Sequence, residues 1–171
     1  MTDVQYLILT RYIDNKSSIY PFNTCPIGNF VRIKTYIVED NPTIRDNLIE
    51  TLEELACIET VGTAETENDS KFWLLHNPSS WTLAIVDLFL KQGSGLGVLA
   101  SLRERPSRQK VVVLTNYATA DIRQRCAQLG VDAVFDKSNE IDALVEFCIQ
   151  QRDLLQGDLL QNPLLPDKLI D

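Results

Sequence analysis

Hydrophobic residues from about residue 33 onward alternate between short β-branched runs and longer stretches with a single apolar stripe. Short β-branched runs are typical of strands, and their regular alternation with helical stretches indicates a parallel sheet. Three of the runs are nearly continuous in apolar residues, as in strands that helices cover on both faces. The pattern predicts strands at Thr35–Val38, Ile58–Gly62, Thr82–Asp87, Lys110–Thr115 and Ala133–Asp136.

The helical stretches repeat apolar residues every three or four positions. Pro42 suits a first turn, whereas Pro78 and Pro106 stop the helices before them. Gly130 stands where a glycine commonly ends a helix. The predicted helices are Pro42–Ala56, Asn68–Asn77, Leu96–Arg105, Thr119–Leu129 and Asn139–Leu155. Together these elements predict an α/β fold with a doubly wound, five-stranded parallel sheet.

The two ends of the chain lack a sustained hydrophobic period. Residues 1–31 are expected to form a loosely attached N-terminal extension. Residues 156–171 contain paired leucines interrupted by Gly157 and two prolines, which argues against a long helix and predicts a C-terminal tail. The domain itself is expected at residues 32–155.

Charge and composition narrow the classes of function. The chain has 24 Asp and Glu against 16 Lys and Arg, and its formal charge of -8 disfavours direct DNA binding. It shows no secretory signal and no apolar run that could span a bilayer, so we expect no membrane association and a cytoplasmic location. The four cysteines form no C-x-x-C pair, and the chain has one histidine, His76, as a further candidate zinc ligand. We therefore interpret the cysteines as reduced apolar residues.

Polar residues stand where the predicted strands end. Glu39 and Asp40 follow the first strand, and Asp87 ends the third. Thr115 ends the fourth strand, and Lys137 follows the fifth. Because the carboxyl ends of parallel strands share one edge of a sheet, we expect these side chains to converge. Three neighbouring carboxylates need a compensating cation or shifted titration, and hard oxygen ligands select Mg²⁺.

This arrangement predicts phosphoryl transfer. Asp87 is the candidate nucleophile, because a carboxylate beside Mg²⁺ can form an aspartyl phosphate. Glu39 and Asp40 would hold the metal ion with Asp87. Lys137 would neutralise one phosphoryl oxygen, and Thr115 would donate a hydrogen bond to another.

Each of these residues also admits a plainer structural role. Glu39 and Asp40 precede a helix and can cap it. Asp87 can be a loop carboxylate, Thr115 an ordinary strand residue and Lys137 a solvated one. The joint occurrence of all five at corresponding strand ends favours the functional interpretation.

Three glycines follow Asp87, at Gly93, Gly95 and Gly97. They lack the G-K-[ST] sequence of a phosphate-binding loop and the spacing of a dinucleotide fingerprint. We interpret them as flexibility in a connecting loop.

The chain resembles the receiver domain of two-component response regulators over about Ile33–Gln151. The resemblance implies the flavodoxin-like (βα)5 fold with strand order 2-1-3-4-5 and dependence on Mg²⁺. Four segments carry it: Tyr36–Asn41, Ile85–Gly97, Val111–Asn116 and Leu129–Ser138.

The resemblance also implies roles for the residues at the strand ends. Glu39 and Asp40 are then the acidic pair and Asp87 the phosphoacceptor. Thr115 is the switch hydroxyl, Lys137 is the family's lysine, and the backbone carbonyl of Phe89 is a further metal ligand.

Some positions depart from the family pattern. Val134 stands where receivers often place Tyr or Phe, with Phe135 next to it, so aromatic gating is expected to be altered. Ser138 replaces the usual proline, and its peptide bond is expected to be trans. Phe89 and Tyr117 form a bulky rim, which leads to the hypothesis that the phosphoryl form hydrolyses slowly.

We expect no effector domain in this chain, so its signal would pass to a protein partner through the face formed by Thr119–Gln150. The resemblance implies phosphorylation by a sensor histidine kinase or phosphotransfer protein. A homodimer is one alternative for the oligomeric state. The rival functions are a phosphate-free adaptor and a Mg²⁺-dependent phosphatase, although Phe89 stands where such phosphatases usually carry a second Asp.

Overall fold

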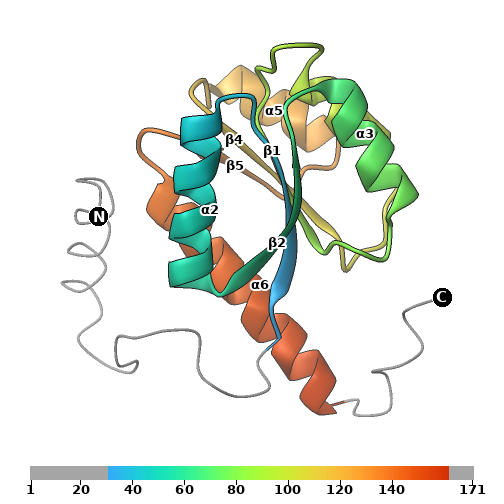
Figure 1. Cartoon of the computed structure of the whole chain (residues 1–171), viewed down its shortest axis with the longest axis vertical. Coiled ribbons are helices and arrows are strands. Elements are labelled where there is room, and N and C mark those ends of the chain that lie inside the picture. Colours follow the sequence, from blue (N-terminus) through green and yellow to red (C-terminus); the bar gives the residue numbers. More distant parts are fainter. Residues whose placement is uncertain (1–30, 162–171) are drawn as a thin grey trace.

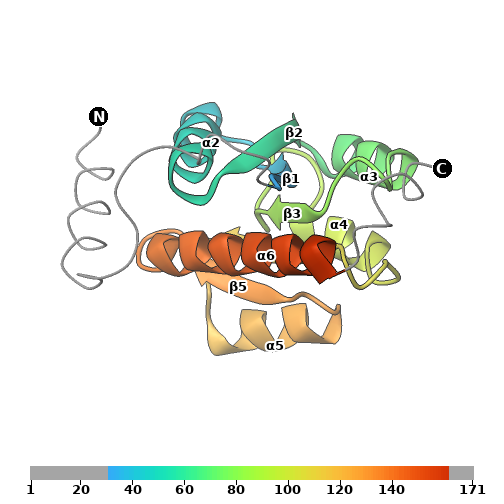
Figure 2. The same cartoon turned by 90° about the horizontal axis from the view of Figure 1, so that it is seen from below.

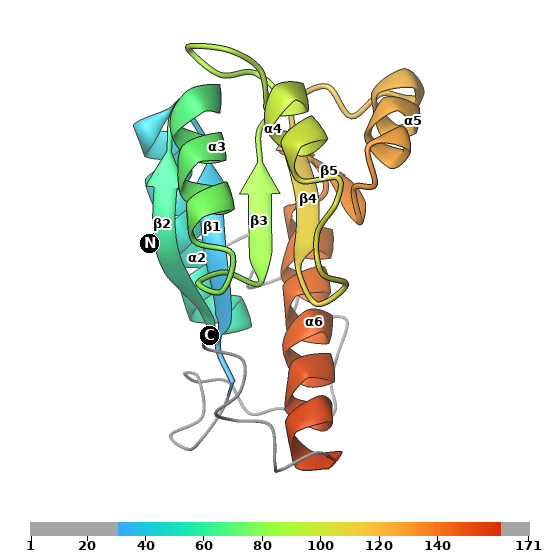
Figure 3. The same cartoon turned by 90° about the vertical axis from the view of Figure 1, so that its right-hand side faces the viewer.

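Five parallel strands form one sheet in the order β2-β1-β3-β4-β5, which confirms the predicted topology. The computed structural model describes residues 31–161, and the rest of the predicted extension and tail lies outside the described residues. All five strands run in the same direction, so their carboxyl ends share one edge (Figure 3). The strands are β1 (Ile33–Val38), β2 (Ile58–Ala64), β3 (Leu83–Val86), β4 (Lys110–Thr115) and β5 (Ala133–Asp136).

The connections between strands are helical, as the hydrophobic periods predict. Helices α2 (Pro42–Ala56) and α3 (Glu67–His76) lie on opposite sides of β1 and β2 (Figures 1 and 2). Within residues 31–161, no helix is both long enough and apolar enough to cross a bilayer. The helices are α2 (Pro42–Ala56), α3 (Glu67–His76), α4 (Gly95–Ser101), α5 (Ala120–Gln128) and α6 (Ile141–Gln161).

The sheet has a separate apolar core on each face. Ile37 and Leu52 belong to the core under α2 and α6, together with Leu144. Val86 and Leu99 belong to the core under α3, α4 and α5. Burying one such aliphatic side chain stabilises the fold by about 1.5–3 kcal/mol, so both faces contribute to holding the strand ends in place.

The sequence left open whether Glu39 and Asp40 cap α2 or bind a metal ion, and the start of α2 bears on this choice. Asn41 is the N-cap, and its side chain accepts hydrogen bonds from the backbone N–H groups of Thr43 (3.0 Å) and Ile44 (3.3 Å). The two acidic residues are therefore not needed as the cap of this helix.

Two helix ends differ from the prediction by four or more residues, and the others differ by at most two. Helix α4 ends at Ser101 rather than at Arg105, whose guanidinium donates instead to the Leu102 carbonyl (3.0 Å) and to Asp132 (2.6 Å). Helix α6 continues to Gln161, six residues beyond the predicted end and through Gly157. A single glycine costs a helix only about 1 kcal/mol, so the argument against a helix after residue 155 was wrong.

Candidate phosphoryl-transfer site

The strand ends hold the candidate residues through backbone hydrogen bonds that continue beyond each strand. The Glu39 N–H donates to the Ala64 carbonyl (3.0 Å), and the Asp87 N–H donates to the Val38 carbonyl (2.9 Å). The Lys137 N–H donates to the carbonyl of Thr115 at 3.0 Å. Each residue is thus fixed relative to a neighbouring strand.

Three carboxylates meet at this edge of the sheet. One oxygen from each of Glu39, Asp40 and Asp87 lies within 4.8 Å of the other two. Glu39 and Asp87 are only 2% and 6% exposed, whereas Asp40 is half-buried. The cluster is therefore buried on one side and open to solvent on the other.

The Lys137 ammonium lies between two of these carboxylates. It donates to Glu39 Oε2 at 2.6 Å and to Asp87 Oδ2 at 2.7 Å. Burial by itself lowers the pKa of Lys137, but the hydrogen bonds to Asp87 and Glu39 outweigh it, so this pKa is raised overall. The lysine stays charged at neutral pH.

Burial acts differently on the acidic partner. Loss of solvent raises the pKa of Glu39, and the hydrogen bond from Lys137 offsets this effect only in part. The N–H of Asn41 also donates to Glu39 Oε1 at 3.1 Å. Removing such a carboxylate from water is unfavourable unless a cation compensates it.

The donor set suits Mg²⁺. Among the described residues, one ammonium contacts this group of three carboxylates, which leaves an excess of negative charge, and all three offer hard oxygen ligands. The Phe89 N–H donates to Asp87 Oδ1 at 3.3 Å, which places this residue beside the cluster. The assignment of the Phe89 carbonyl as a fourth ligand stays a prediction.

Thr115 lies at the end of β4 on the same edge and is fully buried. Its Oγ1 accepts a hydrogen bond from the Tyr117 N–H at 3.4 Å. The Thr115 hydroxyl therefore contacts the loop that follows β4. The role of Thr115 as a switch stays a prediction.

Two aromatic rings stand at the rim of the site. The centroids of Phe89 and Tyr117 are 5.1 Å apart, and their planes are inclined by 59°. Phe89 is 55% exposed and Tyr117 is 60% exposed. They belong to the loops after β3 and β4, so the pair bridges the loop that begins at Asp87 and the loop that follows Thr115.

The other departures from the family pattern are also visible. Phe135 points into the core under α6, where its ring lies 5.9 Å from that of Phe147. Val134 packs on the opposite face, with the core under α5. No peptide bond within residues 31–161 is cis, so the bond before Ser138 is trans as expected.

The sequence did not predict the contacts that hold the loop after Asp87. Glu67, at the start of α3, accepts a hydrogen bond from the Ser94 N–H at 2.9 Å. The only available signal was the glycine spacing at Gly93 and Gly97, which we interpreted as flexibility. Both glycines in fact pack against Glu67.

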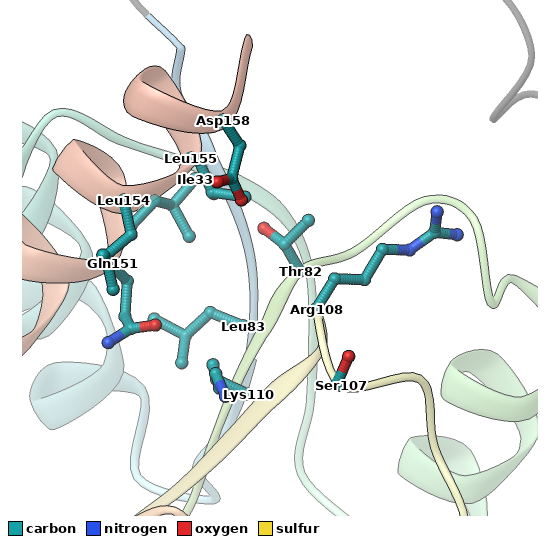
Figure 4. Close-up of a pocket in the computed structure, with 10 residues that line it drawn as sticks. All are labelled: Ile33, Thr82, Leu83, Ser107, Arg108, Lys110, Gln151, Leu154, Leu155 and Asp158. Carbon is teal, nitrogen blue, oxygen red and sulfur yellow. The ribbon is translucent and has the colours of Figure 1, made fainter. Parts of the chain in front are cut away.

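A separate hollow of about 270 Å³ lies at the other edge of the sheet. Figure 4 shows it between α6 and the amino ends of β1, β3 and β4, with Ile33, Leu83 and Lys110 on the strand side. Because the carboxylates lie at the carboxyl ends of the strands, this hollow is not part of their site.

The fold and this cluster match a family of signalling switches. Residues 35–148 match the model of the response regulator receiver domain, and the chain belongs to that family. Receiver domains bind Mg²⁺ at an acidic pocket and act with histidine kinases.

Among curated proteins, the chain is similar to a Pseudomonas aeruginosa protein named "Putative transcriptional regulator". The two are 31% identical over 112 residues, which is 66% of this chain and 53% of the relative. The chain therefore spans about half the length of that protein.

Solved receiver domains share the fold. The receiver domain of Francisella response regulator 1452 superimposes with a TM-score of 0.63 at 18% identity, covering 72% of this chain and 99% of that one. The receiver domain of AraT from Geobacillus stearothermophilus gives a TM-score of 0.61 at 23% identity, covering 75% and 98%.

Proposed function

We propose that this chain is a phosphoacceptor switch in which Asp87 takes a phosphoryl group from a histidine kinase or a phosphotransfer protein. The observation that carries the proposal is the Lys137 ammonium, 2.6 Å from Glu39 and 2.7 Å from Asp87, beside a third carboxylate from Asp40. A structural ion pair needs two charges, whereas a site for a divalent cation and a phosphoryl group needs this larger set.

The transfer uses a pre-oriented carboxylate. An Asp87 oxygen attacks the phosphorus of the donor phosphohistidine, the P–O bond forms, and the P–N bond breaks with its electron pair staying on the imidazole. The hydrogen bonds from Lys137 and from the Phe89 N–H restrict the rotation of the carboxylate, which lowers the entropic cost of reaching the reactive geometry.

Two side chains would meet the charge of the phosphoryl oxygens. Lys137 supplies one positive charge, and the Thr115 hydroxyl at the end of β4 is the second proposed donor. Mg²⁺, when bound by Glu39, Asp40, Asp87 and the Phe89 carbonyl, neutralises further charge on the transferred group.

We propose that the signal leaves through the face formed by Thr119–Gln150. Arg123 of α5 donates to the Val134 carbonyl and to Glu140 (2.6 Å), and the Asp136 N–H donates to Glu140 (2.7 Å). These contacts join α5, β5 and the start of α6 next to Lys137. A change at the phosphoryl site can shift this face between two states if the phosphoryl group binds them unequally.

The partner at this face is proposed to be a protein. A cytoplasmic location, the absence of direct DNA binding and a homodimer stay predictions from the sequence. The phosphatase alternative is disfavoured by Phe89, whose exposed ring stands where an acid–base carboxylate would be needed.

Incubation with a radiolabelled histidine kinase and Mg²⁺ tests the proposal, with Asp87→Asn as the matched variant. Stable label on the wild type alone is the expected result. Steady release of inorganic phosphate with turnover would instead indicate a phosphatase. No label on the wild type, from several kinases and from a small-molecule phosphodonor, would contradict the proposal and favour the adaptor.

A further inference from the structure

The loop between β3 and α4 is held against the start of α3 mainly by Glu67. Its carboxylate accepts a hydrogen bond from the Ser94 N–H (2.9 Å), and its own N–H donates to the Gln92 carbonyl (3.0 Å). Thr66 also pairs with Gln92 as a parallel bridge. Figure 3 shows this loop extending from β3 over the start of α3 and returning to α4. Glu67 therefore holds the loop through both its backbone and its side chain.

Two glycines lie against the Glu67 side chain, where a Cβ would not fit. A Cβ added at Gly97 would lie 2.1 Å from Glu67 Oε1, and one added at Gly93 would lie 2.4 Å from Glu67 Cβ. Gly93 also has a φ of +82°, which other residues rarely adopt. The loop is thus closely packed around Glu67.

A short series of contacts joins Glu67 to the phosphoryl-transfer site. Ser94, which donates to Glu67, pairs with Phe89 as an antiparallel bridge. The Phe89 N–H in turn donates to Asp87 Oδ1 at 3.3 Å. The hydrogen bond at Glu67 is therefore connected to Phe89, whose carbonyl is a proposed metal ligand.

A second tie on the same loop is weaker. Lys91 pairs with Glu65 at 3.1 Å, and Glu65 pairs with Arg45 of α2 at 2.9 Å. The Lys91 side chain is 55% exposed, and exposed ion pairs contribute little. Glu67 is consequently the main contact between this loop and α3.

We propose that Glu67 is a positioning residue, which fixes the loop after Asp87 in the geometry that Mg²⁺ binding and phosphoryl transfer need. This inference rests on the proposed function, because the Phe89 carbonyl, a predicted metal ligand, belongs to the loop. Loss of the Glu67 carboxylate then weakens Mg²⁺ binding although no metal ligand is removed.

Exchange of the Ser94 amide hydrogen and the Kd for Mg²⁺ test the proposal at a temperature well below the unfolding of every variant. In Glu67→Ala, Ser94 exchange is expected to accelerate and the Kd for Mg²⁺ to rise about fivefold, the size expected for the loss of one typical intramolecular hydrogen bond. Glu67→Gln keeps an acceptor and is expected to restore most of both values. Glu59→Gln removes an exposed carboxylate of β2 and is expected to change neither.

Gly97→Ala provides an independent arm. In the wild type its methyl group would displace the Glu67 carboxylate, so it should raise the Kd for Mg²⁺ as Glu67→Ala does. In the Glu67→Ala background the clash is absent, and the same substitution should add no further rise.

Two results would overturn the proposal. One is unchanged Ser94 exchange and Mg²⁺ affinity in Glu67→Ala, and the other is an equal effect of Gly97→Ala in both backgrounds. A wild-type chain that binds no Mg²⁺ and accepts no phosphoryl group would instead overturn the proposed function, and with it the functional role of Glu67.

Discussion

At the scale of single residues, the parallel sheet brings together side chains that stand at the ends of different strands. Glu39, Asp87 and Lys137 each adjoin a strand end, and the observed backbone bonds hold them at one edge. Glu67, by contrast, could not be predicted from the positions of the strand ends. Its contact with Ser94 depends on the path of two loops, which hydrophobic periodicity does not determine.

The aromatic rim leads to a prediction about lifetime. Phe89 and Tyr117 place two exposed aromatic rings next to Asp87 and Thr115, and by the rim hypothesis replacing both by polar residues should admit water to the phosphoryl group. Phe89→Asn with Tyr117→Glu is expected to speed dephosphorylation about tenfold, which corresponds to about 1.4 kcal/mol in the barrier. A time course of label loss measures it, and an unchanged rate would contradict the hypothesis.

Alkaline pH provides a test of the core. Burial, together with the negative charge of Asp69, raises the pKa of Tyr36 from 10.0 to about 12. Because the folded state holds this proton more tightly, the stabilisation is complete below pH 10 and is lost as the pH rises to about 12.

The measurement is the free energy of unfolding of the wild type and Tyr36→Phe across this pH range. The wild type is expected to lose about 2 kcal/mol more than the variant. Tyr117→Phe, which changes an exposed tyrosine, serves as the control. Parallel curves for the wild type and Tyr36→Phe would contradict the expectation.

At the scale of secondary structure, element types followed from periodicity, but some ends depended on distant contacts. Helix α4 ends at Ser101, and Arg105 beyond it pairs with Asp132, 27 positions further along the sequence. Helix α6 continues through Gly157, and the Gln156 side chain accepts a hydrogen bond from the Val31 N–H at 3.0 Å. Neither contact has a local signature.

The cap of α2 gives a prediction at this scale. Asn41→Ala removes the acceptor for the Thr43 and Ile44 N–H groups and is expected to lower the free energy of unfolding by about 1 kcal/mol. Asn47→Ala, an exposed change within the same helix, should be neutral or slightly stabilising. Chemical denaturation measures both, and equal effects would argue against the capping role.

At the scale of the whole molecule, the excess of acidic residues bears on the choice of partner. A formal charge of -8 opposes the phosphate backbone of DNA, although a relative of about twice the matched length is named as a regulator of transcription. The 171-residue chain is expected to leave duplex DNA unshifted in a mobility assay at about 150 mM salt, with or without phosphorylation. A specific, salt-sensitive shift would contradict this expectation.

The overall fold carries the central claim, since it brings distant parts of the sequence to one edge of the sheet. Glu39 and Lys137 are 98 positions apart, yet their side chains are in contact. The proposed function requires that Asp87 is the residue that receives the phosphoryl group.

Mass spectrometry of the peptide that contains Asp87 tests the claim most directly, after incubation with a phosphodonor in the presence or absence of Mg²⁺. The expected result is a phosphoryl group on Asp87 that forms only with Mg²⁺ and is absent from Asp87→Asn. A phosphoryl group on another residue, or one that forms equally well without Mg²⁺, would contradict the claim.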